Sequence, residues 1–380
     1  MKYPFLWLYV LGSIAALAQT DSLEESLATI KPDTRVKALN ELFRTNFNSN
    51  PVKAIGFARQ ALTLATEIDD RKGMAAAYNN LGVAYKGQGA LDKALEYYLL
   101  ALTIYNNIKN KEGIATTKSN LGTIYSIKKN YDQAMRYFEE AKASFTELGE
   151  QEKIIGSMNN LGILHSELQL FEQALKYFSQ AFQLSEKIGK VSADPLNNIA
   201  NLYFRQGNYK RAADYYEKAM ILARNGNDQN TLLYTLTNLG ELYAQSGHTT
   251  KAQAYLDSAS ALSEKLQAYL FQPTLLKSQA TNYAKQNKMK EAYETILRYD
   301  QAKEKLYDEE SMSNIAQMEM ALHLQEKEKE IENLKALDEI KSLQLKSARM
   351  FIVVTVLGMI ILIGLVNFIF TKRNLPRIHQ

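Results

Sequence analysis

The sequence predicts an all-α fold: a superhelical solenoid of helical hairpins, followed by a long helical stalk and one transmembrane helix. One observation is a three-residue phrase that occurs six times, with successive spacings of 40, 40, 38, 40 and 40 residues. A period in this range is typical of a solenoid, because each unit is too small to bury its own apolar face and stacks on its neighbours. A second observation is an apolar run of 21 residues near the C-terminus. The copies of the phrase are Asn80-Leu81-Gly82, Asn120-Leu121-Gly122, Asn160-Leu161-Gly162, Asn198-Ile199-Ala200, Asn238-Leu239-Gly240 and Ser278-Gln279-Ala280.

The composition fits this fold and excludes several classes of function. The 380 residues are 46% hydrophobic and 23% charged, with 18 glycines and 6 prolines, as expected of a globular chain that is helical nearly throughout. The net charge is only +4 and the two signs are interleaved, so the composition predicts no nucleic-acid partner. The absence of cysteine excludes disulfides, thiolate metal sites and a cysteine nucleophile.

No catalytic, cofactor or metal motif is found. The four histidines have no neighbours at metal-ligand spacing, and no Gly-rich loop follows a strand pattern. His165 takes the place of a repeated tyrosine, so we expect it to be a packed core residue. The sequence therefore predicts a protein that is not an enzyme and that uses no cofactor or metal.

The N-terminus predicts export. Residues 1–18 have the pattern of a signal peptide: Lys2 supplies the charge, an apolar stretch follows, and Ala16-Leu17-Ala18 forms a small-residue cleavage site. The alternative is an uncleaved anchor, but about thirteen apolar residues are short for ~30 Å of hydrocarbon. Residues 19–33 then form an N-terminal segment before the repeats.

The C-terminal apolar run predicts one membrane span at residues 350–370. At ~1.5 Å per residue it reaches ~31 Å, enough to cross a bilayer, and basic residues flank it on both sides. A cleaved signal peptide places residues 19–348 across the membrane, and the positive-inside rule leaves the basic tail, residues 371–380, in the cytoplasm.

Each repeat unit has the pattern of a helical hairpin. Small residues recur in two columns seven positions apart, which is typical of helices that approach closely. A bulky residue stands four positions after the first alanine and therefore shares its face. The first column is Ala54, Ala94, Ala134, Ala174, Ala212, Ala252 and Ala292; the second is Ala61, Ala101, Ala141, Ala181, Ala219 and Ala259; the bulky residues are Tyr98, Phe138, Phe178, Tyr216, Leu256 and Ile296.

These positions resemble the tetratricopeptide repeat, whose pattern has Leu-Gly, a tyrosine three residues after the glycine, and then alanine, a bulky aromatic residue and a second alanine at these offsets. The resemblance covers residues 34–313, about seven repeats, and implies a superhelical solenoid. The period is 40 instead of about 34 residues, which implies longer second helices and linkers such as residues 109–113. This feature is similar to the long-repeat subgroup that includes kinesin light chains and cell-polarity adaptors. The first unit is degenerate, with its first helix compressed into about residues 34–47.

The resemblance also implies a ligand groove on one side of the first helices. Asparagine carries a donor and an acceptor, so a ladder of asparagines can pair with the backbone of an extended peptide, and in the resembling adaptors asparagines of this phrase hold peptides. The alternative is that the amide groups of the phrase bond the neighbouring helix and keep the stack in register. The groove otherwise lacks the consistent Lys and Arg set that clamps a C-terminal carboxylate in some chaperone-binding relatives. The predicted groove residues are Asn79, Asn80, Asn120, Asn159, Asn160, Asn197, Asn198, Asn201 and Asn238.

Residues 314–349 predict a charged helical stalk without glycine or proline. Apolar residues from Ile331 to Leu343 recur every three positions, which drifts around a helix and is not a clean heptad seam. The stalk could pack on its twin as a coiled coil in a homodimer, or run as a single helix stabilised by Glu and Lys pairs.

The order of segments resembles the extracytoplasmic half of tetratricopeptide-repeat sensors from bacteria of the Bacteroidetes type, which continue into a histidine kinase or a helix-turn-helix regulator. This chain ends ten residues past the span. We therefore expect a periplasmic scaffold, anchored in the bacterial inner membrane, that binds a peptide or protein segment for assembly or signal sensing with a separate partner. The alternative is a truncated sensor that lacks its output domain.

Overall fold

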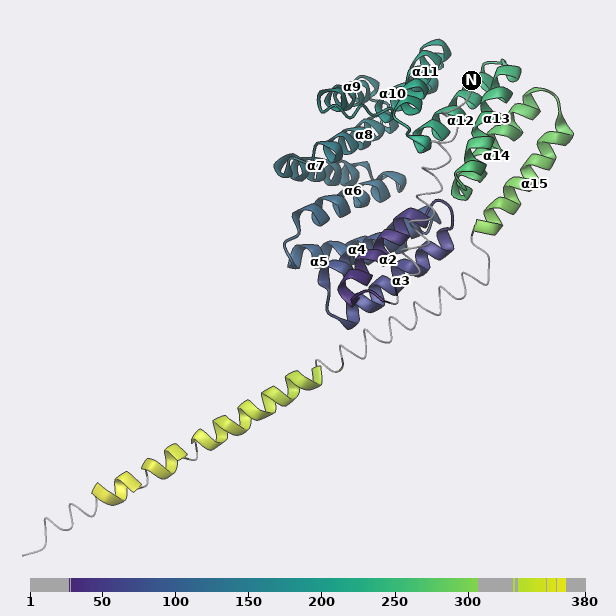
Figure 1. Ribbon diagram of the computed structural model, residues 1–380. Coiled ribbons are helices and arrows are strands. Elements are labelled where there is room, and N and C mark those ends of the chain that lie inside the picture. Colours follow the sequence, from purple (N-terminus) through teal and green to yellow (C-terminus); the bar gives the residue numbers. More distant parts are fainter. Residues whose placement is uncertain are drawn as a thin grey trace, which may run out of the picture. The chain divides into compact units, whose positions relative to one another are not determined.

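The computed structural model describes residue 27, residues 29–306, residue 331, and residues 334–366 except 353 and 360. Up to residue 306 the described chain forms seven helical hairpins (Figure 1). The first helices are α2 (Pro32–Asn46), α4 (Arg71–Gly87), α6 (Lys111–Ile127), α8 (Gln151–Glu167), α10 (Asp194–Arg205), α12 (Gln229–Gln245) and α14 (Gln272–Lys285). The second helices are α3 (Pro51–Glu67), α5 (Leu91–Asn107), α7 (Tyr131–Leu148), α9 (Phe171–Lys187), α11 (Tyr209–Asn225), α13 (Thr249–Lys265) and α15 (Met289–Leu306). The predicted signal peptide and cytoplasmic tail lie outside the described residues.

Each 40-residue unit consists of two similar halves, each a helix of about 17 residues and a short turn. After α4, the Gly89 N–H donates to the Lys86 carbonyl oxygen (3.0 Å) and the Ala90 N–H to the Tyr85 carbonyl oxygen (2.9 Å). This pair of bonds is a Schellman cap, and Gly89 supplies its left-handed residue with φ of +78°. The same cap recurs about every 20 residues, with left-handed residues at Asp69, Gly89, Lys109, Lys129, Gly149, Gln169, Gly189, Gly207, Asn227, Gly247, Gln267 and Asn287.

The origin of the long period differs from the prediction. The expected long linker at residues 109–113 is wrong, because α6 already begins at Lys111. The two helices of the second hairpin, α4 and α5, have 17 residues each. The extra length is therefore not confined to the second helix.

The repeated glycine and alanines mark the contact inside each hairpin. A Cβ added to Gly82 would lie 2.5 Å from Cε1 of Tyr98, and the equivalent glycines Gly122 and Gly162 face Phe138 and Phe178 in the same way. A side chain larger than hydrogen would therefore overlap the bulky residue of the second helix. Both alanine columns are fully buried through Ala259, whereas Ala292 in the last hairpin is half-buried. This confirms the predicted solenoid of hairpins.

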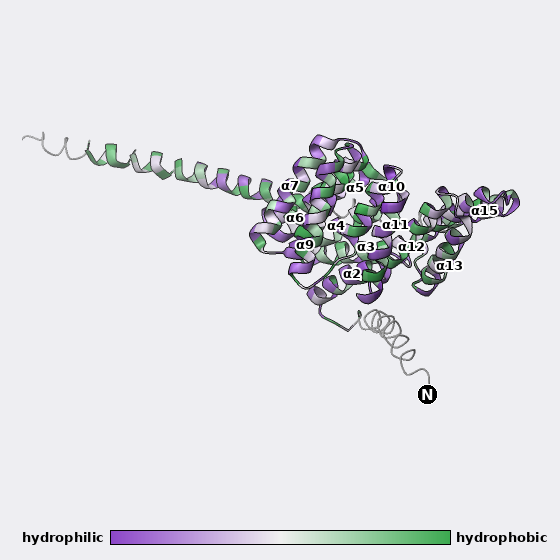
Figure 2. Ribbon diagram, turned by 90° about the horizontal axis from the view of Figure 1, so that it is seen from above, coloured by the Kyte–Doolittle hydropathy of each residue, from purple (hydrophilic) through white to green (hydrophobic). Residues whose placement is uncertain are grey.

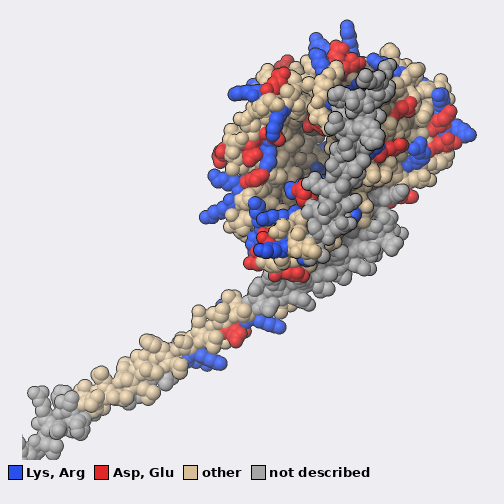
Figure 3. Space-filling view, viewed as in Figure 1, with Lys and Arg blue, Asp and Glu red and all other residues tan. Residues whose placement is uncertain are grey.

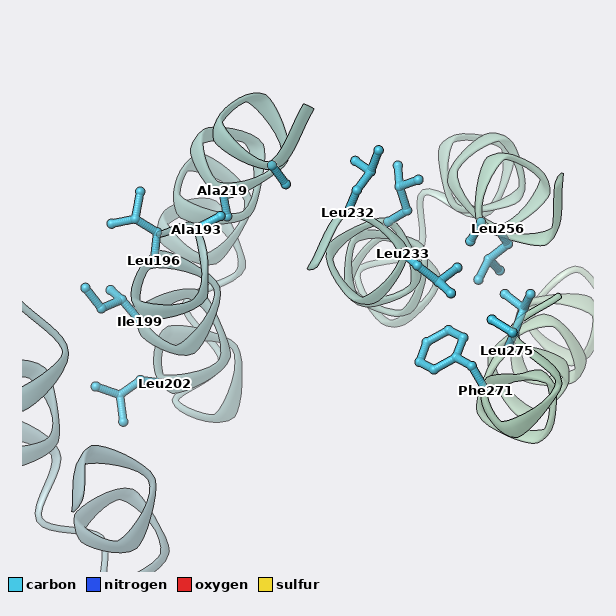
Figure 4. Close-up of a cluster of buried hydrophobic side chains, with 14 of the residues drawn as sticks. Ala193, Leu196, Ile199, Leu202, Ala219, Leu232, Leu233, Leu256, Phe271 and Leu275 are labelled. Atoms are coloured by element: carbon cyan, nitrogen blue, oxygen red, sulfur yellow. The ribbon is translucent and has the colours of Figure 1, made fainter. Parts of the chain in front are cut away.

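The first helices lie on the inner side of the curved array. Successive first helices contact one another from α2 to α14, whereas within the described residues no two successive second helices lie as close. A stack whose first helices are closer together than its second helices must curve towards the first helices. These helices therefore form the concave face. Buried apolar side chains continue between hairpins, and Figure 4 shows one such cluster running from Leu196 to Leu275.

The C-terminal helix is a separate unit. It runs from Leu334 to Val366, 33 residues, and is long and apolar enough to cross a membrane by length and composition. Its hydrophobic residues gather toward its C-terminal part (Figure 2). Of the predicted stalk, residue 331 and residues 334–349 are described, and they are helical.

Candidate functional site

Hydrogen bonds between polar side chains connect the first helices of successive hairpins, and we call this set the amide ladder. In each of its four closed rungs, the side-chain nitrogen of the phrase asparagine donates to a polar side chain of the preceding first helix. The rungs are Asn80 Nδ2 to Asn40 Oδ1 (2.8 Å), Asn120 Nδ2 to Asn79 Oδ1 (3.0 Å), Asn160 Nδ2 to Ser119 Oγ (3.2 Å) and Asn238 Nδ2 to Asn197 Oδ1 (3.3 Å). The amide nitrogens of these four asparagines are therefore already used to hold neighbouring helices in register.

Two rungs have an additional hydroxyl beside them. Thr117 lies three residues before Asn120, and its hydroxyl lies 3.5 Å from Asn79 Oδ1. The hydroxyl of Thr235, at the equivalent position of α12, lies 3.3 Å from Asn197 Oδ1 and makes a shorter bond of 2.7 Å to the Thr231 carbonyl oxygen. One turn of helix thus places a hydroxyl beside the amide nitrogen, near the same oxygen of the preceding helix.

The ladder is open at the junction of α8 with α10. Here Asn159 and Asn198 occupy the positions of acceptor and donor, but Asn159 Oδ1 is buried without a hydrogen-bond partner among the described residues. Pro195 takes the place of Thr117 and Thr235 and has no hydroxyl. Residues 188–193 form a six-residue linker, and α10 has only 12 residues. The shortened spacing of 38 residues in the sequence therefore coincides with a broken rung, which we call the open rung.

A cavity of about 510 Å³ lies on the concave face at this junction. The amide side chains in its wall include both members of the open rung, and Ile163 and Tyr234 add apolar surface that is about half exposed. Lys153 and Asp194 also line the cavity. Figure 3 shows a hollow in the hairpin array, with charged side chains of both signs around it. The cavity can therefore accept both hydrogen-bonding and apolar groups.

The charged residues of the cavity have protein partners. Lys153 forms an ion pair with Glu112, and the hydrogen bond from Lys153 lowers the pKa of that carboxyl. Asp194 Oδ1 accepts a hydrogen bond from the Thr231 hydroxyl (2.8 Å), which also lies 2.6 Å from Asp228 Oδ2. Burial raises the pKa of Asp194; the hydrogen bond from Thr231 opposes this rise, and the nearby Asp228 carboxylate adds to it.

The structure brings together five of the nine predicted groove residues. Asn120, Asn159, Asn160, Asn197 and Asn198 all line the cavity.

The other four lie outside it. Asn79, Asn80 and Asn238 take part in closed rungs. Asn201 accepts a hydrogen bond from the Tyr216 hydroxyl of α11 and so faces the second helix of its own hairpin. The assignment of Asn201 to the groove therefore stays a prediction.

The sequence analysis missed a row of residues one turn before the phrase. Asp194 and Tyr234 lie four positions before Asn198 and Asn238, on the same helix face. The equivalent Thr116 and Gly156 line the cavity as well. The row could have been found by extending the groove face by one turn.

His165 lies away from this cavity. Its ring is tilted against Tyr177, with 5.1 Å between centroids, and Nδ1 lies 2.7 Å from the Leu161 carbonyl oxygen. The side chain is half-buried. It fills the position that tyrosines such as Tyr125 occupy in neighbouring hairpins, where they stack on the second helix. In the part of the chain that the structure describes, no cluster of three or more His, Asp or Glu residues could hold a metal ion.

Comparison with known proteins identifies the fold. Several solved structures resemble this chain, among them these three. The apo form of RapI has 17% identity, covers 71% of this chain and 98% of its own, and has a TM-score of 0.52. The Rap conjugation gene regulator of the plasmid pLS20, in complex with the Phr* peptide, has 21% identity, coverages of 70% and 71%, and a TM-score of 0.51. Aspartyl phosphate phosphatase F from Bacillus subtilis has 17% identity, coverages of 78% and 73%, and a TM-score of 0.50.

Identities this low show the fold alone, and no curated protein matches the chain. The sequence profile of the tetratricopeptide repeat, however, matches residues 47–107, 113–187 and 191–265, more than half of the chain. The chain therefore belongs to the tetratricopeptide repeat family.

Proposed function

We propose that this protein is a scaffold, anchored in a membrane, that binds an extended peptide or protein segment at the open rung and acts through a separate partner. One observation carries the proposal: the cavity lies where Asn159 Oδ1 has no partner among the described residues. A buried acceptor without a donor costs about 1 to 3 kcal/mol. Because this oxygen is itself buried, the Asn159 side chain must rotate towards the cavity before a backbone N–H of a bound segment can reach it and remove that penalty.

The surroundings of the open rung suit an extended segment. The amide groups of Asn159 and Asn198 offer both donors and acceptors, as a peptide backbone requires. Ile163 and Tyr234 give apolar contact for side chains, and the cavity volume of about 510 Å³ is in the usual range for ligand sites. The pLS20 regulator, whose fold is similar, has been solved with a peptide. We propose that this chain also binds a peptide, as a binding module without catalytic chemistry or cofactor.

The test is a comparison of an open and a closed rung. A displayed library of unstructured peptides is selected against the full chain in detergent micelles, and the affinity of a selected peptide is measured by fluorescence anisotropy. The paired change Asn159→Ala and Asn198→Ala should weaken binding about tenfold or more, because each lost hydrogen bond contributes about 0.5 to 1.5 kcal/mol. The matched control is Asn80→Ala, whose closed rung with Asn40 has neither member in the cavity wall and which should bind normally. Equal effects of the two variants would contradict the proposal.

We further propose that residues 350–370 anchor the protein in the bacterial inner membrane with the repeats in the periplasm. The length and composition of Leu334–Val366 support a membrane span. A reporter that is active only in the cytoplasm should work when fused after Gln380 and fail when fused after Ser313. The reverse pattern would reject this orientation, without bearing on the peptide site.

A further inference from the structure

One backbone hydrogen bond joins the two ends of the hairpin array. The N–H of Leu270 donates to the carbonyl oxygen of Asn48 at 3.2 Å. Asn48 lies in the turn between α2 and α3, in the first hairpin. Leu270 lies in the 3-10 helix η1 (Tyr269–Phe271), just before the seventh hairpin. Every other non-helical backbone hydrogen bond recorded for the described residues joins positions close in sequence.

The contact joins opposite edges of the array. The turn at residues 47–50 connects the two helices of one hairpin, whereas residues 266–271 connect one hairpin to the next. Because the helices alternate in direction, these two kinds of turn lie on opposite edges of a solenoid. Because these two loops meet, the superhelix has gone once around its axis. Its first hairpin then touches the start of the seventh hairpin edge to edge.

Both turns in the contact depart from the regular pattern. Most turns of the array have three residues, but that of the first hairpin has four and that before α14 has six. Within η1, the N–H groups of Tyr269 and Phe271 donate to Gln267 and Ala268, whereas the N–H of Leu270 donates to Asn48. The irregular turn thus leaves the Leu270 N–H without a local acceptor, and this N–H bonds the first hairpin instead.

The same turn is fixed to the wall of the cavity. Phe271 is 8% exposed and lies in the core beside Leu233 and Leu275 (Figure 4). Its ring packs edge-on against Tyr234, with 4.7 Å between centroids. Tyr234 lines the cavity and is 54% exposed. A group that contacts Tyr234 from the cavity is therefore only one side chain away from η1.

We propose that the Leu270–Asn48 contact, called the latch below, closes the superhelix on itself and controls entry to the concave face. A single backbone hydrogen bond at an exposed turn exchanges readily with bonds to water, so the latch can open without unfolding a hairpin. A ligand that packs on Tyr234 shifts the balance between latched and open forms through Phe271. Only this control of entry rests on the proposed function; the latch itself does not.

Disulfide trapping tests the latch without any ligand. The chain contains no cysteine, so Asn48→Cys with Leu270→Cys introduces a unique pair. Residues joined by a backbone hydrogen bond lie within disulfide reach. In the full chain in detergent micelles, this pair should oxidise at least about tenfold faster than the control pair Asn48→Cys with Asn227→Cys, because the latch raises the effective concentration of the thiols. Equal rates would overturn the proposal. Adding Tyr234→Ala should slow the first pair several-fold, and an unchanged rate would overturn the coupling through Phe271.

A second measurement removes only the latch donor. Leu270→Pro lacks the N–H, whereas the matched control Leu270→Ala keeps it. Spin labels at Lys37→Cys and Lys290→Cys report the distance between the first and seventh hairpins. We expect one narrow distance distribution in the unchanged background and in Leu270→Ala, and a broader, longer one in Leu270→Pro, with the far-ultraviolet helical signal unchanged. Identical distributions in the two variants would reject the latch.

Discussion

The junction of α6 with α8 and the junction of α8 with α10 use the same kind of side chain in opposite ways. At the first, Asn160 donates to Ser119 and helps to align two helices. At the second, the spacing is shorter by two residues and Asn159 Oδ1 has no partner among the described residues. The comparison shows that an asparagine repeated for packing can become a candidate binding group where the repeat is interrupted. The interruption of the repeat, not the repeated residue itself, distinguishes the candidate site from the other junctions.

The largest expected effect concerns the packing inside the two hairpins that flank the open junction, which carry glycine and alanine at the same repeat position. Gly162 in α8 faces Phe178, which is 1% exposed, and an added Cβ would lie 2.4 Å from the ring. Gly162→Ala should therefore lower the free energy of unfolding by about 1 to 3 kcal/mol, measured by urea unfolding with circular dichroism. The next hairpin carries Ala200 at this position. If Gly162→Ala left the free energy of unfolding unchanged, α8 would tolerate alanine at this position as α10 does. That result would contradict the expected difference between the two hairpins.

The control for that substitution is Gly56→Ala in α3. An added Cβ there meets nothing within 4 Å, so the change should be neutral or stabilising by up to about 1 kcal/mol, as expected for a helix interior. A loss of stability as large as that of Gly162→Ala would mean that the close ring contact does not explain the result.

The next largest effect is the difference in stability lost when an asparagine is removed from a closed rung or from the open rung. Asn80 is 7% exposed, and its loss leaves the buried Asn40 Oδ1 without this donor. Asn80→Ala should therefore lower the free energy of unfolding by about 1 to 3 kcal/mol. Asn198→Ala removes no rung bond and should stay within about 0.5 kcal/mol. Urea unfolding of both variants checks this, and equal losses would show that Asn198 also holds the register.

The sequence predicted the hairpins well because their causes are local and repeated. Glycine, alanine and a bulky residue recur at fixed offsets, and each is needed for the same helix contact. The open rung could not be predicted from the phrase, since Asn198 resembles its equivalents in the neighbouring repeats. Its different role depends on Pro195 and on the lengths of α10 and of the preceding linker, which become visible only when the helices are placed side by side. The latch depends on superhelical closure over the whole array, which no local pattern determines.

Closing the open rung should abolish the difference between the junctions. Pro195→Thr restores the hydroxyl that Thr117 and Thr235 supply at the equivalent positions, and it should donate to Asn159 Oδ1. We expect a change in stability below about 1 kcal/mol, because one new hydrogen bond offsets the loss of a proline at the helix start. The affinity for a selected peptide should fall several-fold, as measured by fluorescence anisotropy. The matched control is Pro273→Thr, at the second position of α14, which should bind as before. Normal binding by Pro195→Thr would remove Asn159 from the site.

The smallest expected difference is in pH dependence. The pKa of Asp194, at the open junction, is raised above its ordinary 3.8, mainly by burial, with Asp228 adding to the effect and the Thr231 hydrogen bond opposing it. The folded protein thus holds this proton more tightly than the unfolded chain, so the contribution of Asp194 to stability is fully present below pH 3.8 and is lost as the pH rises through the folded pKa. Asp194→Asn keeps an oxygen that can accept from the Thr231 hydroxyl but does not ionise. In urea unfolding at a series of pH values, its stability relative to the unchanged protein should therefore increase from pH 3.5 to pH 7. Asp214→Asn removes an exposed carboxylate from α11 and serves as the matched control. If the free energy of unfolding of both variants changed with pH in the same way, the folded protein would not hold the proton of Asp194 more tightly than the unfolded chain does.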